Sequence, residues 1–241
     1  MSVDVHINEP RQSPSVMALP SIPPLENGDY LTRDEFERRY NAMPADVKAE
    51  LIEGRVYMTS PVRYKSHGAP NRNLNTWLGV YSAFTPGVSG AKNTTVLLDQ
   101  PNEPQPDGLL IIDELLGGQT TVSADDYLEG APELVVEVSA SSASLDLREK
   151  LSVYRRNGVR EYIVWSVFDQ QFKWFSLEAG EYVELNPDED GVIRSRVFPG
   201  LWLDVDALLK DNMAKVLAIL QQGLASPEHT DFIEQLSKGK R

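Results

Sequence analysis

The segment PELVVEVSASSASLDLREKLSVY, residues 132–154, decides the fold of this chain. Residues 133–138 form an apolar run rich in β-branched side chains, which is typical of a strand buried on both faces of a sheet. Small residues follow, and a helix is then expected from Asp146 to the stop signal Asn157-Gly158. The segment therefore predicts a central strand, a loop and a short helix.

Three charged residues mark the place where the sequence predicts a site. Glu137 lies near the end of the buried strand, where a carboxylate needs a cation or a hydrogen-bond donor. Lys150 lies in the first turn of the helix, where its charge opposes the helix dipole, although a solvated lysine is the simpler interpretation. Asp107 opens a second apolar run, 108–112, although a carboxylate after a proline is more often a turn residue.

These three residue types in this order suit one kind of chemistry. Carboxylates at the ends of neighbouring buried strands can hold a divalent cation that prefers hard oxygen ligands, typically Mg²⁺ or Mn²⁺. A lysine beside them can orient or deprotonate a water and can stabilise the charge that develops on a phosphate. Asp107, Glu137 and Lys150 are therefore candidates for a metal-dependent hydrolytic site, with turn, ion-pair and surface roles as the alternatives.

The rest of the chain alternates expected strands and helices, which predicts an α/β or α+β domain with one central mixed β-sheet flanked by helices. A helix after Thr32 and an amphipathic helix at 205–220 are expected at the two ends. The segment 117–129 is expected to be an excursion loop, and the tail from Ser226 is expected to fray. The other expected elements are strands at 49–54, 55–58, 94–99, 108–112, 161–167, 171–177 and 181–185 and a helix at 67–81.

The composition narrows the classes of function. The 241 residues carry a net charge of −13, which argues against nonspecific adhesion to nucleic acid but leaves room for a locally basic or metal-filled cleft. The chain has no cysteine, so disulfides and cysteine nucleophiles are excluded. No apolar run has the length of a membrane span, so we expect a soluble cytoplasmic protein without membrane association. Zinc-binding histidine spacing, a serine nucleophile elbow and a phosphate-binding glycine loop are all absent from the sequence.

Six short motifs occur in one order, spread over roughly Tyr30 to Leu209. In that order the chain resembles the Uma family of bacterial restriction endonucleases, within the PD-(D/E)XK nuclease superfamily. Each motif alone has little specificity, but the six in sequence are strongly specific. They are Glu50-Leu-Ile-Glu-Gly-Arg-Val, the stretch from Ser60-Pro61 to His67, Gln105-Pro-Asp107, Pro132-Glu-Leu-Val-Val-Glu-Val-Ser139, Lys150-Leu-Ser-Val-Tyr154 and Gly158-Val-Arg-Glu-Tyr-Ile-Val164.

The resemblance implies a restriction endonuclease-like core, DNA as the substrate, and Asp107 and Glu137 as ligands of Mg²⁺ or Mn²⁺. The superfamily pattern places a lysine two residues after the glutamate, where this chain has Ser139. The resemblance implies that Lys150, on the following helix, supplies that amine instead. Glu50 and His67 also match recurrent family positions. They could contact water, metal or phosphate, with capping or strand-end hydrogen bonding as the alternative for each.

Three hypotheses about function stay open. The first is a metal-dependent endonuclease that hydrolyses DNA phosphodiester bonds, and a homodimer is expected for it. The second is a catalytically inactive member that keeps the fold in order to bind nucleic acid or protein. The third is a dimer whose C-terminal helix contacts the partner and whose role is assembly. For all three we expect a flexible arm at 1–29, an endonuclease-like domain at 30–209 and a C-terminal helix and tail at 210–241.

Overall fold

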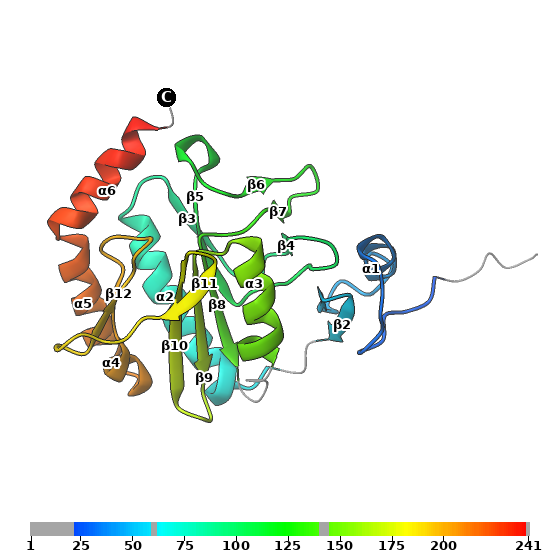
Figure 1. The fold of residues 1–241 in the computed structure, drawn as a ribbon. Helices are drawn as coiled ribbons and strands as arrows, with labels where there is room; N and C mark the ends of the chain where they lie inside the picture. Colours follow the sequence, from blue (N-terminus) through cyan, green and yellow to red (C-terminus); the bar gives the residue numbers. More distant parts are fainter. Residues whose placement is uncertain (1–21, 59–61, 140–144, 240–241) are drawn as a thin grey trace, which may run out of the picture.

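A six-stranded mixed sheet forms the centre of the computed structural model, which describes residues 22–58, 62–139 and 145–239 (Figure 1). The predicted central strand is β8 (Leu134–Ser139), which pairs antiparallel with β5 (Gly108–Ile112) and parallel with β9 (Glu161–Ser166). This arrangement confirms the predicted α/β fold with its mixed sheet. The outer strands are β3 (Val88–Ala91) beyond β5, and β10 (Gln171–Glu178) and β11 (Glu181–Glu184) beyond β9.

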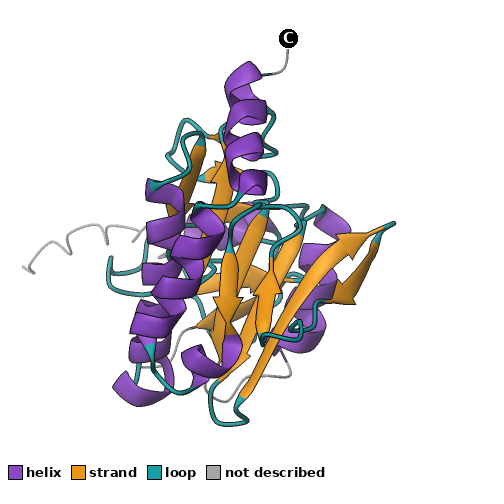
Figure 2. Cartoon of the chain, turned by 90° about the vertical axis from the view of Figure 1, so that its left-hand side faces the viewer, coloured by secondary structure: helices purple, strands orange, loops and turns teal. Residues whose placement is uncertain are grey.

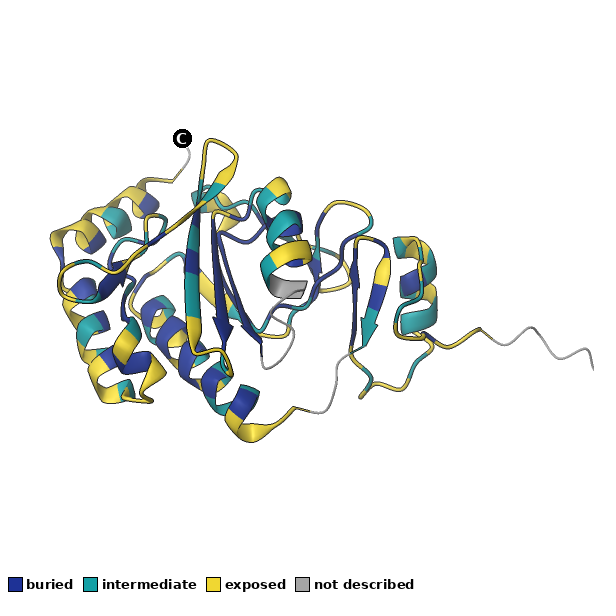
Figure 3. Ribbon diagram, turned by 60° about the horizontal axis from the view of Figure 1, so that its bottom comes forward, coloured by how far each residue is buried: buried dark blue, intermediate teal, exposed yellow. Residues whose placement is uncertain are grey.

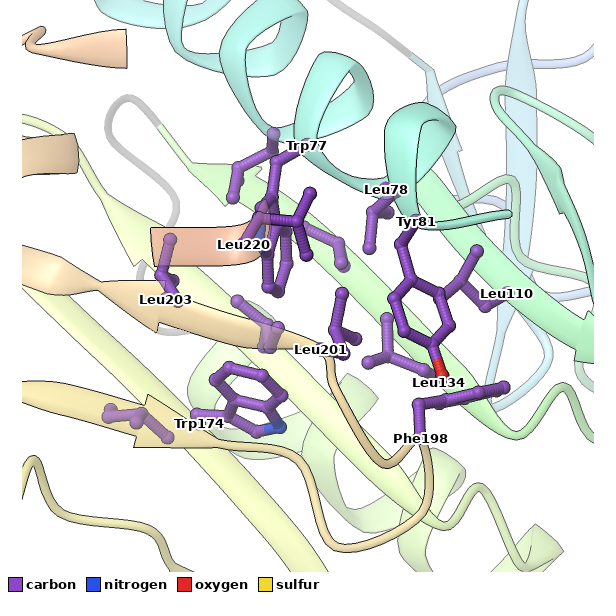
Figure 4. Packing of buried hydrophobic residues seen from close by; sticks show 14 of the residues in the cluster. Trp77, Leu78, Tyr81, Leu110, Leu134, Trp174, Phe198, Leu201, Leu203 and Leu220 are labelled. Carbon is purple, nitrogen blue, oxygen red and sulfur yellow. The ribbon is translucent and has the colours of Figure 1, made fainter. Parts of the chain in front are cut away.

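One face of the sheet packs against α2 (Ala69–Ala83) and α5 (Met213–Leu224), and this contact forms the larger hydrophobic core (Figure 2). Every second residue of β8 points into this core, because successive side chains of a strand alternate between its faces. Figure 4 shows Trp77 of α2 and Leu220 of α5 side by side within it. The amphipathic pattern expected at 67–81 is thus that of α2, which follows a π-helical turn, η1 (Tyr64–Gly68).

The opposite face of the sheet is covered by α3 (Leu151–Asn157), which follows a second π-helical turn, η3 (Leu145–Lys150). Val135 of β8 is fully buried there, in a cluster that includes Val153 of α3. Both β8 and β9 are buried along their whole length, as Figure 3 shows. Because Glu137 lies two residues after Val135, its side chain leaves the strand on the α3 side.

A smaller unit near the N-terminus lies on the α3 side of the sheet (Figure 1). It contains α1 (Arg33–Tyr40) and a hairpin of β1 (Ala49–Ile52) and β2 (Arg55–Met58). The turn residues Glu53 and Gly54 both have positive φ, 53° and 75°, as a type I′ hairpin turn requires. The unit has its own hydrophobic cluster, whose buried members are Leu25, Phe36, Ala49, Leu51 and Val56.

Short pairings complete the described fold. The segment 117–129, expected as a loop, contains β6 (Thr121–Val122) and β7 (Leu128–Glu129), and β7 also pairs with β4 (Val96–Leu97). These strands extend the α3 side of the molecule. The remaining elements are a 3₁₀ turn, η2 (Glu114–Leu116), and an antiparallel pair, β12 (Val192–Arg194) and β13 (Trp202–Asp204).

The C-terminal region differs from the prediction in two ways. The single helix expected at 205–220 is wrong, because α4 (Val205–Leu209) ends before α5 begins. Asp211 has a positive φ of 56°, which no helix continues through, and the Asn212 side chain caps the start of α5. The frayed tail is also wrong, because α6 (Pro227–Lys238) starts there with Ser226 as its N-cap.

Some predictions concern residues that the structure does not describe. Most of the arm at 1–29, the Ser60-Pro61 break and the loop at 140–144 lie outside the described residues, as does the side chain of Asp146. Leu25, at the end of the expected arm, is buried. Within the described ranges, none of the helices combines the length and apolar character needed to cross a bilayer.

Candidate active site

The pairing of β5 with β8 places the two predicted metal-binding carboxylates opposite each other. Gly108 is the register partner of Val136, so the next position along the ladder sets Asp107 against Glu137. Directly opposed residues on one face of an antiparallel pair have Cβ atoms about 4.5–5.5 Å apart. The strands are also joined at this point by the backbone N–H of Val138, which donates to Asp107 Oδ2 at 2.8 Å.

Glu137 belongs to a buried cluster of ionisable side chains. Lys150 Nζ lies 2.9 Å from Glu137 Oε1 and 3.0 Å from Glu50 Oε2. The exposed fractions of Glu137, Lys150 and Glu50 are 4%, 4% and 7%. The interpretation of Lys150 as a solvated helix charge is therefore wrong, because its amine is buried between two carboxylates. When all three groups are ionised, the cluster carries one more negative than positive charge.

Glu50 reaches this cluster from the N-terminal hairpin. It lies on β1, and its Oε1 accepts a hydrogen bond from the backbone N–H of Gln105 at 2.6 Å. Gln105 precedes Asp107 by two residues, so Glu50 fixes the approach to β5 as well as the position of the lysine. The sequence separation between Glu50 and Lys150 is 100 residues. The contact therefore depends on the docking of the hairpin beside η3.

Tyr154, which was not among the predicted site residues, completes the cluster. Its hydroxyl donates to Glu137 Oε1 at 2.9 Å, and the residue is fully buried. Burial raises the pKa of the Tyr154 phenol well above its usual value, and the Glu137 carboxylate raises it further. The hydroxyl thus stays protonated and remains a donor. A buried tyrosine hydroxyl needs a hydrogen-bond partner, and Glu137 was already predicted to be a buried acceptor. These two expectations together could have indicated Tyr154 as a site residue.

Asp107 lies in a second cluster, with residues of η1 and α2. Asp107 Oδ1 is 3.1 Å from His67 Nε2 and accepts a hydrogen bond from Asn71 Nδ2 at 2.8 Å. The other ring nitrogen of His67, Nδ1, is 2.8 Å from the carbonyl oxygen of Val138. Both ring nitrogens thus face acceptors, which a doubly protonated imidazole satisfies. In a neutral ring, Asn71 Nδ2, 3.3 Å from Nε2, can donate to that nitrogen instead.

Asn71 is the second residue that the sequence analysis missed. It follows His67 by four positions, so both lie on one face of the helical segment formed by η1 and α2. Asn75 continues the same face and donates to the backbone oxygen of Asp107 at 3.0 Å. This row of polar residues at a spacing of four was visible in the sequence. It therefore could have indicated which helix face meets Asp107.

The structure brings the five predicted residues together as two adjoining clusters. Lys150 contacts both Glu137 and Glu50, and His67 contacts Asp107. Val138 links the two clusters. Its backbone N–H donates to Asp107 Oδ2, and its carbonyl oxygen lies 2.8 Å from His67 Nδ1. The residue before it in β8 is Glu137.

The donor chemistry of these residues fits a hard divalent cation. Asp107, Glu137 and Glu50 are carboxylates, the ligands that Mg²⁺ and Mn²⁺ prefer. Within the described parts of the chain, no group of three or more His, Cys, Asp or Glu residues is arranged to hold a metal ion. A site with two protein carboxylates and several waters, as is usual for Mg²⁺, needs no such group.

The site thus combines opposed carboxylates from two neighbouring strands of a mixed sheet with a buried lysine. In fold, the chain is similar to a solved structure described as "a putative nuclease belonging to DUF820 from Anabaena variabilis ATCC 29413", with a TM-score of 0.52. The two sequences are 13% identical, and the match covers 72% of this chain and 96% of the other. The likeness shows that the two chains share a fold.

The sequence itself gives the family. The family model Uma2, described as "Putative restriction endonuclease", matches residues 33–206. The chain therefore belongs to the Uma2 family, and the family expected from the sequence motifs is confirmed. No match was found among curated proteins.

Proposed function

We propose that this protein is a metal-dependent endonuclease that hydrolyses phosphodiester bonds of DNA. The observation that carries the proposal is the buried contact of Lys150 with Glu137, which lies opposite Asp107 on the neighbouring strand. Burying a lysine ammonium between two carboxylates, beside the ends of inner strands of the sheet, has a high desolvation cost. Such a cost is common where a charge is needed for chemistry. The nuclease fold and the Uma2 family support the same reaction class.

In this proposal, Asp107 and Glu137 would hold Mg²⁺ or Mn²⁺. When bound, such an ion lowers the pKa of water and polarises the phosphate. The Lys150 ammonium would orient the attacking water and stabilise the negative charge that develops on the phosphate oxygens. Hydrolysis forms a bond from the water oxygen to phosphorus and breaks the bond to the leaving sugar oxygen, which takes up a proton.

The other contacts keep these groups in place. Glu50 and Tyr154 hold Lys150 and Glu137 respectively, which fixes the amine and carboxylate that must act together. His67 and Asn71 hold Asp107 Oδ1 from the other side. The homodimer and the cytoplasmic location expected from the sequence stay predictions.

Plasmid cleavage tests this proposal. The wild-type protein is expected to nick or linearise supercoiled DNA with Mg²⁺ or Mn²⁺ and to stop when EDTA is added. The variant Glu137→Ala is expected to lose at least about a hundredfold in rate, in the range of a single acid–base or electrostatic group. The control is Glu184→Ala, since Glu184 is exposed on β11 and pairs with Lys173 on the neighbouring strand.

Two results would count against the proposal. Wild-type protein that leaves plasmid intact with either metal would favour the alternative of a binding module that has kept the fold. Cleavage by Glu137→Ala at the wild-type rate would place the chemistry elsewhere or in a contaminant. Equal loss in Glu137→Ala and Glu184→Ala would indicate damage to the fold instead of loss of a site residue.

A further inference from the structure

A groove of about 540 Å³ opens directly beside the candidate site. His67 and Asn71, which both contact Asp107 Oδ1, form part of its wall. From there it runs along the exposed face of α2 to Lys92 and Asn93, which follow β3. No residue of 117–129 lines it, so that segment does not close it. A polymer bound at Asp107 would therefore have this groove as its path along the surface.

The charge of the groove is opposite to that of the whole chain. The net charge of the protein is −13, yet none of the described residues that line the groove is Asp or Glu. Its basic residues are Lys48, Arg72 and Lys92. Such a local positive surface in an acidic protein attracts an anion to this place, because the acidic surface elsewhere repels it.

Two basic side chains of the groove have no carboxylate partner among the described residues. Arg72 and Lys92 are exposed and form no salt bridge with the described residues. Arg63 and Lys65, in the exposed stretch that leads into the groove, form none either. Several exposed cations elsewhere are paired with carboxylates, among them Arg38, Arg156, Arg194, Arg196, Lys210 and Lys238. Arg72 donates hydrogen bonds to the side-chain oxygen of Asn73, but no carboxylate of the described residues neutralises its charge. The charges of these four cations are thus available to a bound anion.

The remaining wall of the groove suits nucleotides. It carries side-chain amides and hydroxyls, and such groups hydrogen-bond to base edges and sugars. Next to it Tyr64 is 71% exposed, and an exposed aromatic ring beside basic residues is a stacking surface for an unpaired base. The volume lies in the range of roughly 300–1,000 Å³ that is typical of small-ligand sites. A groove of this size is suited to part of one strand. The amide and hydroxyl residues of the wall are Asn71, Asn75, Thr76, Ser82 and Asn93.

We propose that this groove binds a single DNA strand that leads away from the candidate site, with its phosphates at Arg72 and Lys92 and its unpaired bases against the amide wall. The inference rests on the proposed nuclease function for the identity of the polymer. It adds that the protein binds unpaired or locally opened DNA in preference to duplex. Arg72 and Lys92 act in strand binding and do not contact the reacting phosphate.

The test measures binding without cleavage. Fluorescence anisotropy of a labelled DNA strand, and of the same strand in a duplex, is recorded in EDTA over a range of salt concentrations. Wild-type protein is expected to bind the single strand more tightly. The double variant Arg72→Ala/Lys92→Ala is expected to weaken binding and to flatten the plot of log K against log salt by roughly 1.4, or about 0.7 for each phosphate that is no longer neutralised. The control is the double variant Lys210→Ala/Lys238→Ala, which removes one exposed lysine at the end of α4 and one on α6. It is expected to keep the wild-type slope.

Three results would overturn the inference: an unchanged slope for Arg72→Ala/Lys92→Ala, duplex binding as tight as single-strand binding, or no binding by the wild-type protein. Thermal melting identifies a folding defect, and both variants are expected to melt like wild type because the four residues are exposed. The outcome is independent of the cleavage assay. A protein that binds the strand in the groove but leaves plasmid intact with metal would remove the proposed nuclease function and leave this inference standing.

Discussion

Lys150→Met is expected to lower the free energy of unfolding by roughly 3–5 kcal/mol, the usual cost of removing one partner from a buried ion pair. The substitution keeps the apolar stem of the side chain but leaves the Glu50 and Glu137 carboxylates facing each other without the ammonium between them. Urea denaturation monitored by circular dichroism measures the change. The matched control is Lys210→Met, which removes an exposed pair with Asp206 and is expected to cost less than about 0.5 kcal/mol.

The same variant tests the catalytic role of the lysine. At a temperature where Lys150→Met is still folded, its rate of DNA cleavage at saturating Mn²⁺ is expected to fall at least about a hundredfold. Lys210→Met is expected to cleave at the wild-type rate. A Lys150→Met protein with unchanged stability and unchanged rate would mean that the buried contacts of Lys150 do not exist in solution.

Val135→Asp is expected to prevent folding altogether. Val135 is fully buried in β8, with paired strands on both sides and α3 packed against its face. An aspartate there has neither a cation nor enough donors, so it carries the full cost of a buried unpaired charge. The expected results are insoluble protein on expression and, for any soluble fraction, no cooperative unfolding transition.

The control for this prediction is Val122→Asp, the same substitution on the short strand β6. Val122 is 65% exposed, so the new carboxylate stays in water, and a change within about 0.5 kcal/mol is expected. A cooperatively folded Val135→Asp protein would show that β8 is not the centre of the sheet. Loss of folding in both variants would indicate that any added negative charge is harmful to this acidic chain.

The central elements could be predicted from the sequence because their signals are local. The β-branched run between Pro132 and Ser139 has no helical period, and the Glu53-Gly54 turn has one compatible hairpin type. The break between α4 and α5 was missed because the apolar residues keep a helical spacing across it, so the period alone hides the stop at Asp211. The start of α6 had a local signal, Ser226 before a proline, that outweighs the polar composition of the tail.

The site could be predicted only in part. A carboxylate in an apolar strand identified Glu137 without any knowledge of its partner, because an isolated buried charge is too costly. The partner depends on the fold: Lys150 meets Glu50 only because the N-terminal hairpin docks beside η3, and nothing local to either residue encodes that contact. The same is true of His67 and Asp107, which η1 and the start of β5 bring together.

Binding of Mn²⁺ to the purified protein, followed by electron paramagnetic resonance of the free ion, tests the central claim that Asp107 and Glu137 hold a divalent cation. Wild-type protein is expected to bind Mn²⁺, and Asp107→Asn and Glu137→Gln are each expected to weaken binding at least about tenfold, the lower limit for loss of even an outer-shell partner. Glu184→Gln, on the exposed strand β11, is expected to bind like wild type. Absence of Mn²⁺ binding by folded wild-type protein, or wild-type affinity in both site variants, would contradict the account.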